Sequence, residues 1–315
     1  MLKSIDISPN SKILVTGGTG LVGHALLKAL YMEGFQNVIS IGSKDCDLRN
    51  SIAVENLMEH TKPDYVFHLA ARVYGLGGNS KYKSDILFDN VLINTNIIEQ
   101  CRRFGIKKIV AMGSGCVYPE LPGQQELFEE QIWDGPPHPS EDSYAHAKRL
   151  MLAQLNAARE QYGLSSAFVV SGNLYGPNDS FNIEEGHVVP SLIAKFHAAK
   201  RASTSVRIWG SGISIRDFTY ADDTARALIS ILRNIEGAVN MGSGMRYSIR
   251  DIVEILHLLT GVPIEWDNTK PDGQLVRFYN LDQLFSTGFV PLFSLHDGIY
   301  ATYDWYEQNW TIARR

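Results

Sequence analysis

Short apolar runs alternate with longer amphipathic segments through the first half of the chain. The runs predict buried strands and the segments predict helices, because strand side chains repeat with a period of two and helix side chains with a period of about 3.6. The predicted strands cover residues 12–16, 37–41, 65–69, 108–112 and 166–171, and the predicted helices cover residues 24–31, 84–104 and 143–162. This βαβ order predicts an α/β protein with a Rossmann-type, doubly wound parallel sheet.

The alternation of apolar runs and amphipathic segments becomes less regular after residue 178. Helical stretches stand out near residues 188–200 and 248–260, and no internal repeat or low-complexity segment is visible. We expect this part to form a smaller α/β lobe assembled from several insertions. The predicted division gives residues 1–179 and 216–244 to the Rossmann domain, and residues 180–215 and 245–315 to the smaller lobe.

A glycine-rich segment, Gly17–Gly23, joins the first predicted strand to the helix that follows it. Its glycines satisfy G-x-x-G-x-x-G when counted from Gly17 and G-x-G-x-x-G when counted from Gly18. Such a segment makes a tight turn, lets the backbone approach a pyrophosphate and aims a helix N-terminus at the anion. We therefore expect a dinucleotide here, with the candidate contacts Gly17, Gly20, Leu21, Val22 and Gly23.

The second predicted strand ends without the acidic residue that usually holds the ribose 2′-hydroxyl of NAD. Ser43 and Lys44 follow it, and Lys44 can meet a 2′-phosphate, so the sequence favours NADP(H); the alternative is that Lys44 is a solvated surface charge. Asp47 and Leu48 lie where an adenine ring would be held. The end of the third strand is expected beneath the cofactor, with the residues Leu69, Ala70 and Ala71.

Tyr144 and Lys148 are four residues apart on a predicted helix and therefore share one of its faces. An ammonium group fixed beside a phenol favours the phenolate, and we expect it to lower the pKa of Tyr144. A tyrosine tuned in this way exchanges a proton with a carbonyl or alcohol oxygen. Ser114 follows the fourth strand and is expected to donate a second hydrogen bond to the same oxygen. Taken alone, the Tyr-x-x-x-Lys spacing is also an ordinary amphipathic one.

The composition argues against several other classes of protein. The chain has 315 residues and a formal net charge of −5 without a basic run, so no nucleic-acid partner is expected. Its three cysteines, at positions 46, 101 and 116, have no metal-ligand spacing and favour a reducing, cytoplasmic compartment. No run approaches the length of about 18 apolar residues that a membrane span needs, and the first ten residues lack a signal-peptide core, so no membrane association is expected.

Longer motifs give the chain a resemblance to a known family. They are Asp47–Leu48, His68–Ala71, Gly113–Pro119, Tyr144–Lys148, Asn173–Asp179, Asn182–Pro190, Trp209–Gly212 and Thr269–Gly273. With them the chain resembles the extended short-chain dehydrogenase/reductases and, within these, the GDP-L-fucose synthase family, over nearly its whole length. The most specific parts are Cys116, after the serine, and the Gly-His-Val-x-Pro block around His187.

The resemblance implies an NADPH-dependent enzyme that epimerises a GDP-linked 4-keto sugar at C3 and C5 and then reduces C4. A 4-ketone acidifies the protons at C3 and C5, and inversion needs a base on one face of the sugar and an acid on the other. By resemblance, Cys116 is the base and His187 the acid. In the reduction Tyr144 protonates the C4 oxygen, Lys148 holds the ribose, and Ser114 polarises the carbonyl. Without the family, a buried structural cysteine and a surface histidine are the alternatives.

The same resemblance implies further binding residues. Arg216 is expected to grip the nucleotide diphosphate, because a guanidinium fork suits phosphate oxygens; the alternative is an ion pair with Asp217 or Asp222. The other expected substrate contacts are Asn173, Val189, Lys195, Trp209 and Arg277. Additional cofactor contacts are expected from Asn173, Leu174 and His187, and no metal ion is implied.

Three departures from the family pattern leave alternatives open. Tyr74 and Gly77 alter a loop, Gly115 replaces the small hydroxyl residue usual between serine and cysteine, and Leu275–Val276 interrupts a stretch that is usually basic. One alternative is a C4 reductase that acts on another GDP-4-keto sugar, a heptose or a dideoxy-hexose, without epimerising it. Another is a non-catalytic NADP sensor, against which the Ser-Tyr-Lys set argues. The two long helices of the first half commonly pair in this superfamily, so a homodimer is expected.

Overall fold

The computed structural model describes residues 5–73, 81–119, 126–184, 186–269 and 276–314, apart from the side chains of residues 276 and 277. A six-stranded parallel sheet forms its larger part, with the strand order β11-β6-β4-β3-β1-β2. Its strands are β1 (Lys12–Thr16), β2 (Asn37–Ile41), β3 (Tyr65–His68), β4 (Lys108–Met112), β6 (Ser166–Ser171) and β11 (Gly237–Met241). The order reverses between β1 and β3, so the sheet is doubly wound, which confirms the predicted fold class.

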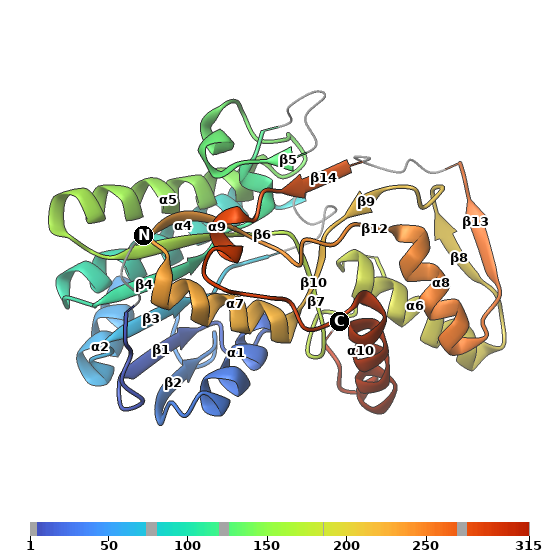
Figure 1. Ribbon diagram of the computed structural model, residues 1–315, viewed down its shortest axis with the longest axis horizontal. Helices are drawn as coiled ribbons and strands as arrows, with labels where there is room; N and C mark the ends of the chain where they lie inside the picture. Colours follow the sequence, from blue (N-terminus) through green and yellow to red (C-terminus); the bar gives the residue numbers. More distant parts are fainter. Residues whose placement is uncertain (1–4, 74–80, 120–125, 185, 270–275, 315) are drawn as a thin grey trace.

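Helices cover both faces of this sheet (Figure 1). One face carries α1 (Leu21–Met32) and α7 (Ala221–Asn234), and the other carries α2 (Ser51–Thr61), α4 (Lys83–Arg103) and α5 (Asp142–Tyr162). The strand β1 shows the division: Ile13 and Val15 belong to the core under α1 and α7, whereas Leu14 belongs to the core under α2, α4 and α5. A strand buried on both faces has this alternation.

The observed boundaries differ from the predicted ones by a few residues. The strand predicted to end at residue 69 ends at His68, and the helix predicted from residue 24 begins at Leu21, directly after the glycine-rich turn. The helix α5 ends at Tyr162, and its C-cap, Gly163, has a φ of +73° that closes the last turn without the strain that a Cβ would bring. Two 3-10 helices are also present, η1 (Gly115–Val117) and η2 (Glu129–Trp133).

A smaller lobe lies beside the sheet, at the right of Figure 1. It contains α6 (Val188–Ala202), α8 (Ile249–Thr260) and α10 (Leu295–Asn309), packed with the parallel pair β8 (Val206–Trp209) and β13 (Ile264–Asp267). Two of these helices, α6 and α8, coincide with the helical stretches predicted from the sequence. Its core includes the stacked rings of Phe181 and Tyr306, whose centroids are 4.3 Å apart.

Short strands join the two lobes. They are β5 (Glu126–Leu127), β7 (Asn173–Tyr175), β9 (Ile215–Arg216), β10 (Phe218–Tyr220), β12 (Tyr247–Ser248) and β14 (Val276–Tyr279). The strand β7 pairs with β10, and the others form a sheet in the order β12-β9-β14-β5. Because β14 pairs with β5, the chain returns from the smaller lobe to the larger one after residue 276.

This return corrects the predicted domain division in one segment. Tyr279 and Leu281, assigned to the smaller lobe, pack in the core under α2, α4 and α5. Leu284, in α9 (Asp282–Phe285), and Phe289 pack in the core under α1 and α7. The rest of the division stays a prediction.

Two features are absent from the described residues. None of their helices is long and apolar enough to cross a membrane. Nor do three or more of their His, Cys, Asp and Glu side chains come together in a way that could hold a metal ion.

Candidate active site

The turn between β1 and α1 leaves no space for a side chain at two of its glycines. Gly17 has a φ of +73°, and a Cβ there would lie 2.8 Å from the backbone nitrogen of Ala70. A Cβ on Gly23 would lie 2.4 Å from the carbonyl oxygen of Gly17. The N-cap of α1 is Gly20, which makes no side-chain cap, so the first N–H groups of the helix are presented to an anion. The turn therefore fits the pyrophosphate of a dinucleotide.

A buried chain of hydrogen bonds fixes the ends of β1 and β3 beneath this turn. Thr16 Oγ1 and His68 Nδ1 lie 2.8 Å apart, and His68 Nε2 lies 3.0 Å from Asn94 Oδ1. Because Asn94 Oδ1 only accepts, His68 Nε2 carries the ring proton and the Thr16 hydroxyl donates to Nδ1. Burial, followed by the charge of Lys148, lowers the pKa of His68 to about 3, so the ring stays neutral. Ala70 N also donates to Thr16 Oγ1, at 3.3 Å.

The carboxylate of Asp45, which no sequence pattern singled out, lies close to the end of β2. Asp45 Oδ2 accepts a hydrogen bond from Gly42 N at 2.8 Å, and Cys46 N approaches Gly42 O at 3.3 Å in the same turn. The side chains of Ser43, Lys44 and Asp45 are all exposed. Asp45 therefore shapes the turn that presents Lys44 where the 2′-phosphate is predicted.

The residues predicted around the adenine differ in their surroundings. Asp47 forms an ion pair with Arg49 at 2.9 Å, and Arg49 lies 3.4 Å from Asp89 on α4. Leu48 is buried in the core under α2, α4 and α5, so its side chain has a packing role. The predicted contacts after β3 are half-buried at its carboxyl end: Leu69, Ala70 and Ala71.

Two hydrogen bonds hold α5 against the end of β4. Lys148 Nζ donates to Met112 O at 2.7 Å, and Arg149 Nε donates to Val117 O at 2.8 Å. Both long side chains are buried, with 1% and 7% of their surface exposed. Residues beyond β4 are thereby held against the first turns of α5.

The structure brings Ser114, Cys116, Tyr144 and Lys148 together at this place. Ser114 is the N-cap of η1 and accepts a hydrogen bond from Cys116 N at 3.4 Å. The Lys148 ammonium lies 5.6 Å from the centroid of the Tyr144 ring. Cys116 lies in η1, which packs against α5, the helix that carries Tyr144 and Lys148. A hydroxyl, a thiol, a phenol and an ammonium thus share the carboxyl end of one strand.

The pKa of Tyr144 moves in the direction opposite to the one expected from the sequence. Burial raises it, and the charges of Cys116 and Glu141 add to the effect. Lys148 does not reverse this, because its ammonium is itself buried and directed to Met112 O; burial lowers the pKa of Lys148 to about 8. Tyr144 therefore holds its proton at neutral pH, which suits a proton donor.

His187 belongs to the smaller lobe. It is the N-cap of α6, with an extended backbone (φ −68°, ψ 163°) and an exposed side chain. Cys116, in contrast, is 7% exposed and follows a strand of the large sheet. The thiol and the imidazole therefore come from different lobes.

Arg216 lies half-buried on β9. Its Nη1 donates a hydrogen bond to Ile215 O at 2.8 Å, and the two carboxylates considered as its ion-pair partners have contacts of their own. Asp217 is buried and accepts hydrogen bonds from the backbone (2.9 Å) and the hydroxyl (2.7 Å) of Ser243. Asp222 pairs with Lys28 at 2.7 Å. A role for Arg216 toward a ligand is compatible with this arrangement.

The other predicted substrate residues differ in exposure. The Lys195 ammonium lies 5.1 Å over the ring of Trp209, which is 63% exposed. Val189, in contrast, is 2% exposed in the core of the smaller lobe, so its side chain offers a ligand little surface. Arg277 pairs through its backbone with Arg216, and its side chain lies outside the described part.

The remaining predicted positions are Asn173 and Leu174, which follow β6, and the positions that depart from the family pattern. Asn173 is exposed and donates to Asp217 O at 3.3 Å, and Leu174 packs against the core under α1 and α7. The departures at Tyr74, Gly77 and Leu275 lie outside the described residues.

Tyr279 fills the space that Gly115 leaves open. A Cβ on Gly115 would lie 1.9 Å from the Tyr279 hydroxyl oxygen and 2.9 Å from its Cζ. The same ring packs over Gly172, where a Cβ would lie 3.0 Å from Cε2, and against the Tyr118 ring at 5.9 Å. The departure at Gly115 is therefore matched by an aromatic side chain from β14, which brings a hydroxyl to this place from another strand.

We expect Gly115→Ser to lower the free energy of unfolding by about 1–3 kcal/mol, the usual cost of overpacking a filled site. Tyr279→Leu in the same chain should recover part of this loss, because it removes the hydroxyl and the ring carbon that meet the new Cβ. Urea unfolding of the two single variants and the double variant measures this coupling. Strictly additive losses would show that the two positions do not compete for space.

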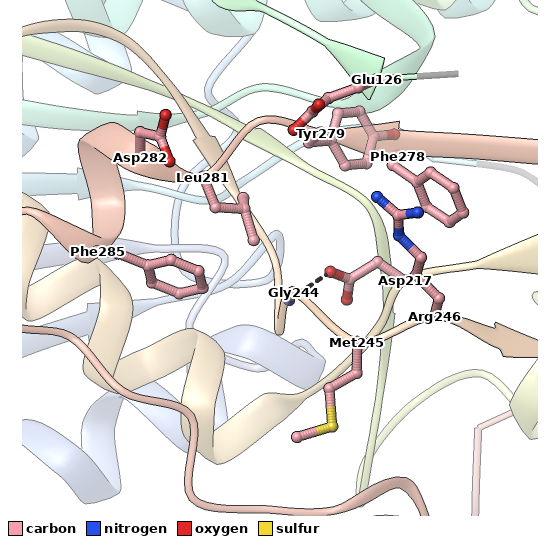
Figure 2. A pocket seen from close by; sticks show the side chains of 10 residues that line it. All are labelled: Glu126, Asp217, Gly244, Met245, Arg246, Phe278, Tyr279, Leu281, Asp282 and Phe285. Atoms are coloured by element: carbon pink, nitrogen blue, oxygen red, sulfur yellow. Dashed lines mark hydrogen bonds between the residues drawn. The ribbon is translucent and has the colours of Figure 1, made fainter.

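A small cavity of about 160 Å³ lies beside β14. Figure 2 shows the side chains that line it. The Asp217 carboxylate lies in it and accepts from Gly244 N at 2.7 Å, and the Arg246 guanidinium lies 3.9 Å from the centroid of the Phe278 ring. None of the four groups gathered after β4 lines this cavity, and it is too small for a dinucleotide. Tyr279 belongs to both places, because its ring lines the cavity and its hydroxyl reaches Gly115.

Comparisons with known proteins agree with this geometry. Residues 13–242 match the model of the NAD dependent epimerase/dehydratase family. The chain is 36% identical to GDP-L-fucose synthase 1 of Arabidopsis thaliana, covering 95% of this chain and 94% of that protein. It superposes on a GDP-L-fucose synthetase from Naegleria fowleri bound to NADP with a TM-score of 0.93 and 31% identity, covering 100% and 98% of the two chains. It superposes on a GDP-mannoheptose C4 reductase from Campylobacter jejuni with NADP bound with a TM-score of 0.86 and 29% identity, covering 96% and 100%.

These similarities extend nearly from end to end and confirm the resemblance that the motifs indicate. The family match includes the glycine-rich turn and the segment from Ser114 to Lys148. The chain therefore belongs to the NAD dependent epimerase/dehydratase family and, within it, to the GDP-L-fucose synthase family of the extended short-chain dehydrogenases/reductases.

Proposed function

We propose that this chain is an NADPH-dependent epimerase–reductase that converts GDP-4-keto-6-deoxy-mannose, or a close analogue, by epimerisation at C3 and C5 and reduction at C4. One observation carries the proposal: Ser114, Cys116, Tyr144 and Lys148 meet at the carboxyl end of β4 in a chain of this family. A reductase without epimerase activity needs no thiol there.

The residues present fit NADP(H). The glycine turn would receive the pyrophosphate, since a Cβ at Gly17 or Gly23 would collide with backbone atoms and the N-terminus of α1 bears no side-chain cap. Lys44 is the cation for the 2′-phosphate, and Lys148 is the group for the nicotinamide ribose. The bound cofactor supplies the hydride that reduces C4.

Epimerisation is assigned to the thiol and the imidazole. Cys116, as its thiolate, removes the proton from C3 or C5, and His187 delivers a proton to the opposite face of that carbon. The electron pair left by the proton is delocalised onto the C4 oxygen, where Ser114 and Tyr144 donate hydrogen bonds. His187 is exposed and regains its proton from solvent, and Cys116 gives up the proton that it removed.

Reduction uses the same two oxygen donors. Tyr144 transfers its proton to the C4 oxygen as the carbonyl becomes an alcohol, and Ser114 polarises the carbonyl. The raised pKa of Tyr144 keeps this proton in place before the reaction. Arg216 on β9 is the proposed partner of the diphosphate, and the Lys195–Trp209 pair offers a ring and a charge to the nucleotide.

The alternative function is C4 reduction alone, on a GDP-linked 4-keto heptose or dideoxy-hexose. Two observations favour it. The departure at Gly115, whose space the Tyr279 side chain fills, lies next to Cys116 in the chain. The fold is also closely similar to that of a GDP-mannoheptose C4 reductase. In that case Cys116 and His187 serve as binding groups.

The test is incubation with NADPH and a panel of GDP-4-keto sugars that includes the 6-deoxy-mannose, heptose and dideoxy-hexose forms. NMR of the products then reads the configuration at C3, C4 and C5. Inversion together with reduction supports the proposed function, and reduction with retained C3 and C5 supports the alternative. NADPH that is oxidised with none of these sugars would contradict both.

We expect the chain to use NADPH more efficiently than NADH. Lys44→Glu should reduce this preference by about tenfold, because a charge that attracts the 2′-phosphate is replaced by one that repels it. The ratio of kcat/KM for the two cofactors measures the preference. Lys62→Glu is the matched control, since Lys62 is also exposed but precedes β3, at the amino ends of the strands, whereas Lys44 follows the carboxyl end of β2. Equal use of both cofactors by the unmodified chain would show that Lys44 faces only solvent.

The proposal also places the chain in the cytoplasm as a homodimer paired through α4 and α5. These helices pack side by side on one face of the sheet and expose apolar side chains outward, among them Phe88 (63%) and Leu150 (41%). Light scattering during size-exclusion chromatography tests this assembly, and a monomeric mass at micromolar concentration would contradict it.

A further inference from the structure

The smaller lobe holds a cavity of about 630 Å³, a volume within the range of about 300–1,000 Å³ that is usual for small-molecule sites. One wall is a face of α6, from Ala194 to Ala202, and a second is formed by Tyr306 and Trp310 at the end of α10. The two helices pack against each other in this lobe (Figure 1). Residues 181–184 form the third wall. None of the residues that line the cavity belongs to the proposed cofactor or substrate sites.

A buried imidazole lines this cavity, and both of its ring nitrogens lack a partner. His197, on α6, is 6% exposed, and neither its Nδ1 nor its Nε2 has a hydrogen-bond partner among the described residues. Burial lowers the pKa of His197; the charges of Arg201 and Lys200 add to this effect, and that of Glu307 opposes it. The ring is therefore neutral at neutral pH and offers one N–H donor and one acceptor. Two unmet hydrogen bonds in a buried ring are costly, and a ligand in the cavity can supply both partners.

Aromatic rings and a cation surround the imidazole. The ring of Tyr306 lies edge-on to that of His197 at 5.2 Å, and the ring of Trp310 is tilted against it at 5.7 Å. Phe181 stacks on Tyr306 at 4.3 Å. The Arg201 guanidinium lies 4.0 Å from the centroid of the Trp310 ring, and its side chain is exposed. A guanidinium held over a ring can still donate to a carboxylate or phosphate, so the cavity combines flat apolar surface with an anion-binding group.

Hydrogen bonds hold the third wall in place. Ser191 Oγ, near the start of α6, donates to Ile183 O at 2.8 Å, and Phe181 N donates to Arg314 O at 2.7 Å. The wall is thereby joined to α6 on one side and to the segment after α10 on the other. The cavity is preformed, and binding does not have to order this segment first. Glu184, the acidic residue of the lining, is exposed and can accept a hydrogen bond from an amino or hydroxyl group.

We propose that this cavity is a second ligand site of the chain, which takes an aromatic molecule with an acidic group. The ring of the ligand packs against Phe181, Tyr306 and Trp310, its acidic group pairs with Arg201, and a polar atom bonds to His197. A nucleoside monophosphate and an aromatic carboxylic acid are the two sources of this chemistry. The site goes beyond the proposed function and does not depend on it, because none of these residues takes part in the proposed reaction.

The test follows the ring nitrogens of His197 by NMR. The full chain carries ¹⁵N-labelled histidine, and the His197 signals are assigned by their loss in His197→Phe, or in His197→Gln if the first variant does not fold. GMP and indole-3-acetate are then titrated separately. We expect a saturable shift of the His197 signals with at least one of them. A shift with GMP alone assigns a nucleoside phosphate, and one with indole-3-acetate alone assigns a carboxylic acid. No saturable shift with either probe would overturn the proposal.

Arg201→Gln is the main variant, and Lys200→Gln is its matched control. Both remove one positive charge from an exposed position of α6, but Lys200 pairs with Glu307 at 2.9 Å and does not line the cavity. We expect Arg201→Gln to raise the dissociation constant by ~10-fold or more, the scale of one lost charge-assisted hydrogen bond, and Lys200→Gln to leave it nearly unchanged. Equal effects of the two variants would contradict the site. So would a GMP shift that Arg201→Gln leaves unchanged, since that shift comes from nucleotide bound elsewhere.

Two further measurements test the shape of the site and the need for the acidic group. Ala198 lines the cavity at an exposed position, so Ala198→Trp fills the space without overpacking the core and should remove the saturable shift. The uncharged counterpart of the bound probe, guanosine or indole, should bind ~10-fold more weakly or worse. Retained binding in Ala198→Trp, or equal affinity for the charged and uncharged probes, would overturn the proposal.

Discussion

Tyr144→Phe is expected to lower the rate of C4 reduction by ~10²-fold or more, the usual scale for the loss of a general acid. The phenol of Tyr144 is the proposed proton donor at the end of β4, and burial raises its pKa, which keeps it protonated. Phenylalanine keeps the ring that lies beside the Lys148 ammonium, so the packing of α5 is retained. NADPH oxidation under single-turnover conditions measures the chemical step, and isothermal titration with GDP measures nucleotide binding, which we expect to change little.

Tyr162→Phe is the matched control for this variant. Tyr162 lies on the same helix, at its last turn, and is 55% exposed. It should leave the rate of reduction unchanged. Near-normal NADPH oxidation by Tyr144→Phe would remove Tyr144 from the chemistry and leave Ser114 as the candidate donor.

The large sheet could be predicted from the sequence because its strands are buried on both faces. The run Ile13–Val15 is apolar for this reason, and the glycines after the strand are required by direct backbone contact, as at Gly17 and Gly23. Tyr144 and Lys148 share one helix face, as their spacing predicts, because α5 is regular over 21 residues. Features that depend on local periodicity and on the steric limits of turns can therefore be predicted from the sequence.

Features that depend on long-range pairing could not be predicted. Tyr279 reaches Gly115 only because β14 pairs with β5, and no local pattern signals that pairing. The return of the chain through Leu284 to the large sheet has the same origin. The reversed direction of the Tyr144 pKa arises from burial and from the hydrogen bond of Lys148 to a carbonyl, which a spacing of four residues does not reveal.

One missed feature did have a signal in the sequence. Asn94 interrupts the helical series of apolar residues at positions 87, 91, 98 and 101, and such an exception marks a buried polar contact. The structure shows the contact, since Asn94 accepts from the ring of His68 beneath the cofactor turn. Asp45 had a weaker signal, because it stands four residues after the last residue of β2 and returns to the strand end only through its side chain.

Cys116→Ser is expected to abolish proton exchange at C3 and C5 while the reduction at C4 survives. A serine hydroxyl is much too weak an acid to supply the anion that a thiol provides near neutral pH. The volume of the side chain changes little, and Ser114 can still cap η1 by accepting from the backbone nitrogen of residue 116. Turnover in heavy water, with the products read by NMR and mass spectrometry, should therefore give a sugar that is reduced at C4, carries no solvent deuterium at C3 or C5 and keeps their configuration.

His187→Asn should give a different product from Cys116→Ser. The thiolate still removes a proton, so deuterium continues to enter, but no acid delivers a proton to the opposite face and inversion falls. This difference assigns the base and the acid to the two lobes from which Cys116 and His187 come. Loss of exchange in both variants alike would mean that His187 is needed for proton removal as well. A wild-type product without deuterium at either carbon, from a sugar that is turned over well, would leave the chain a C4 reductase, with Cys116 and His187 as binding groups.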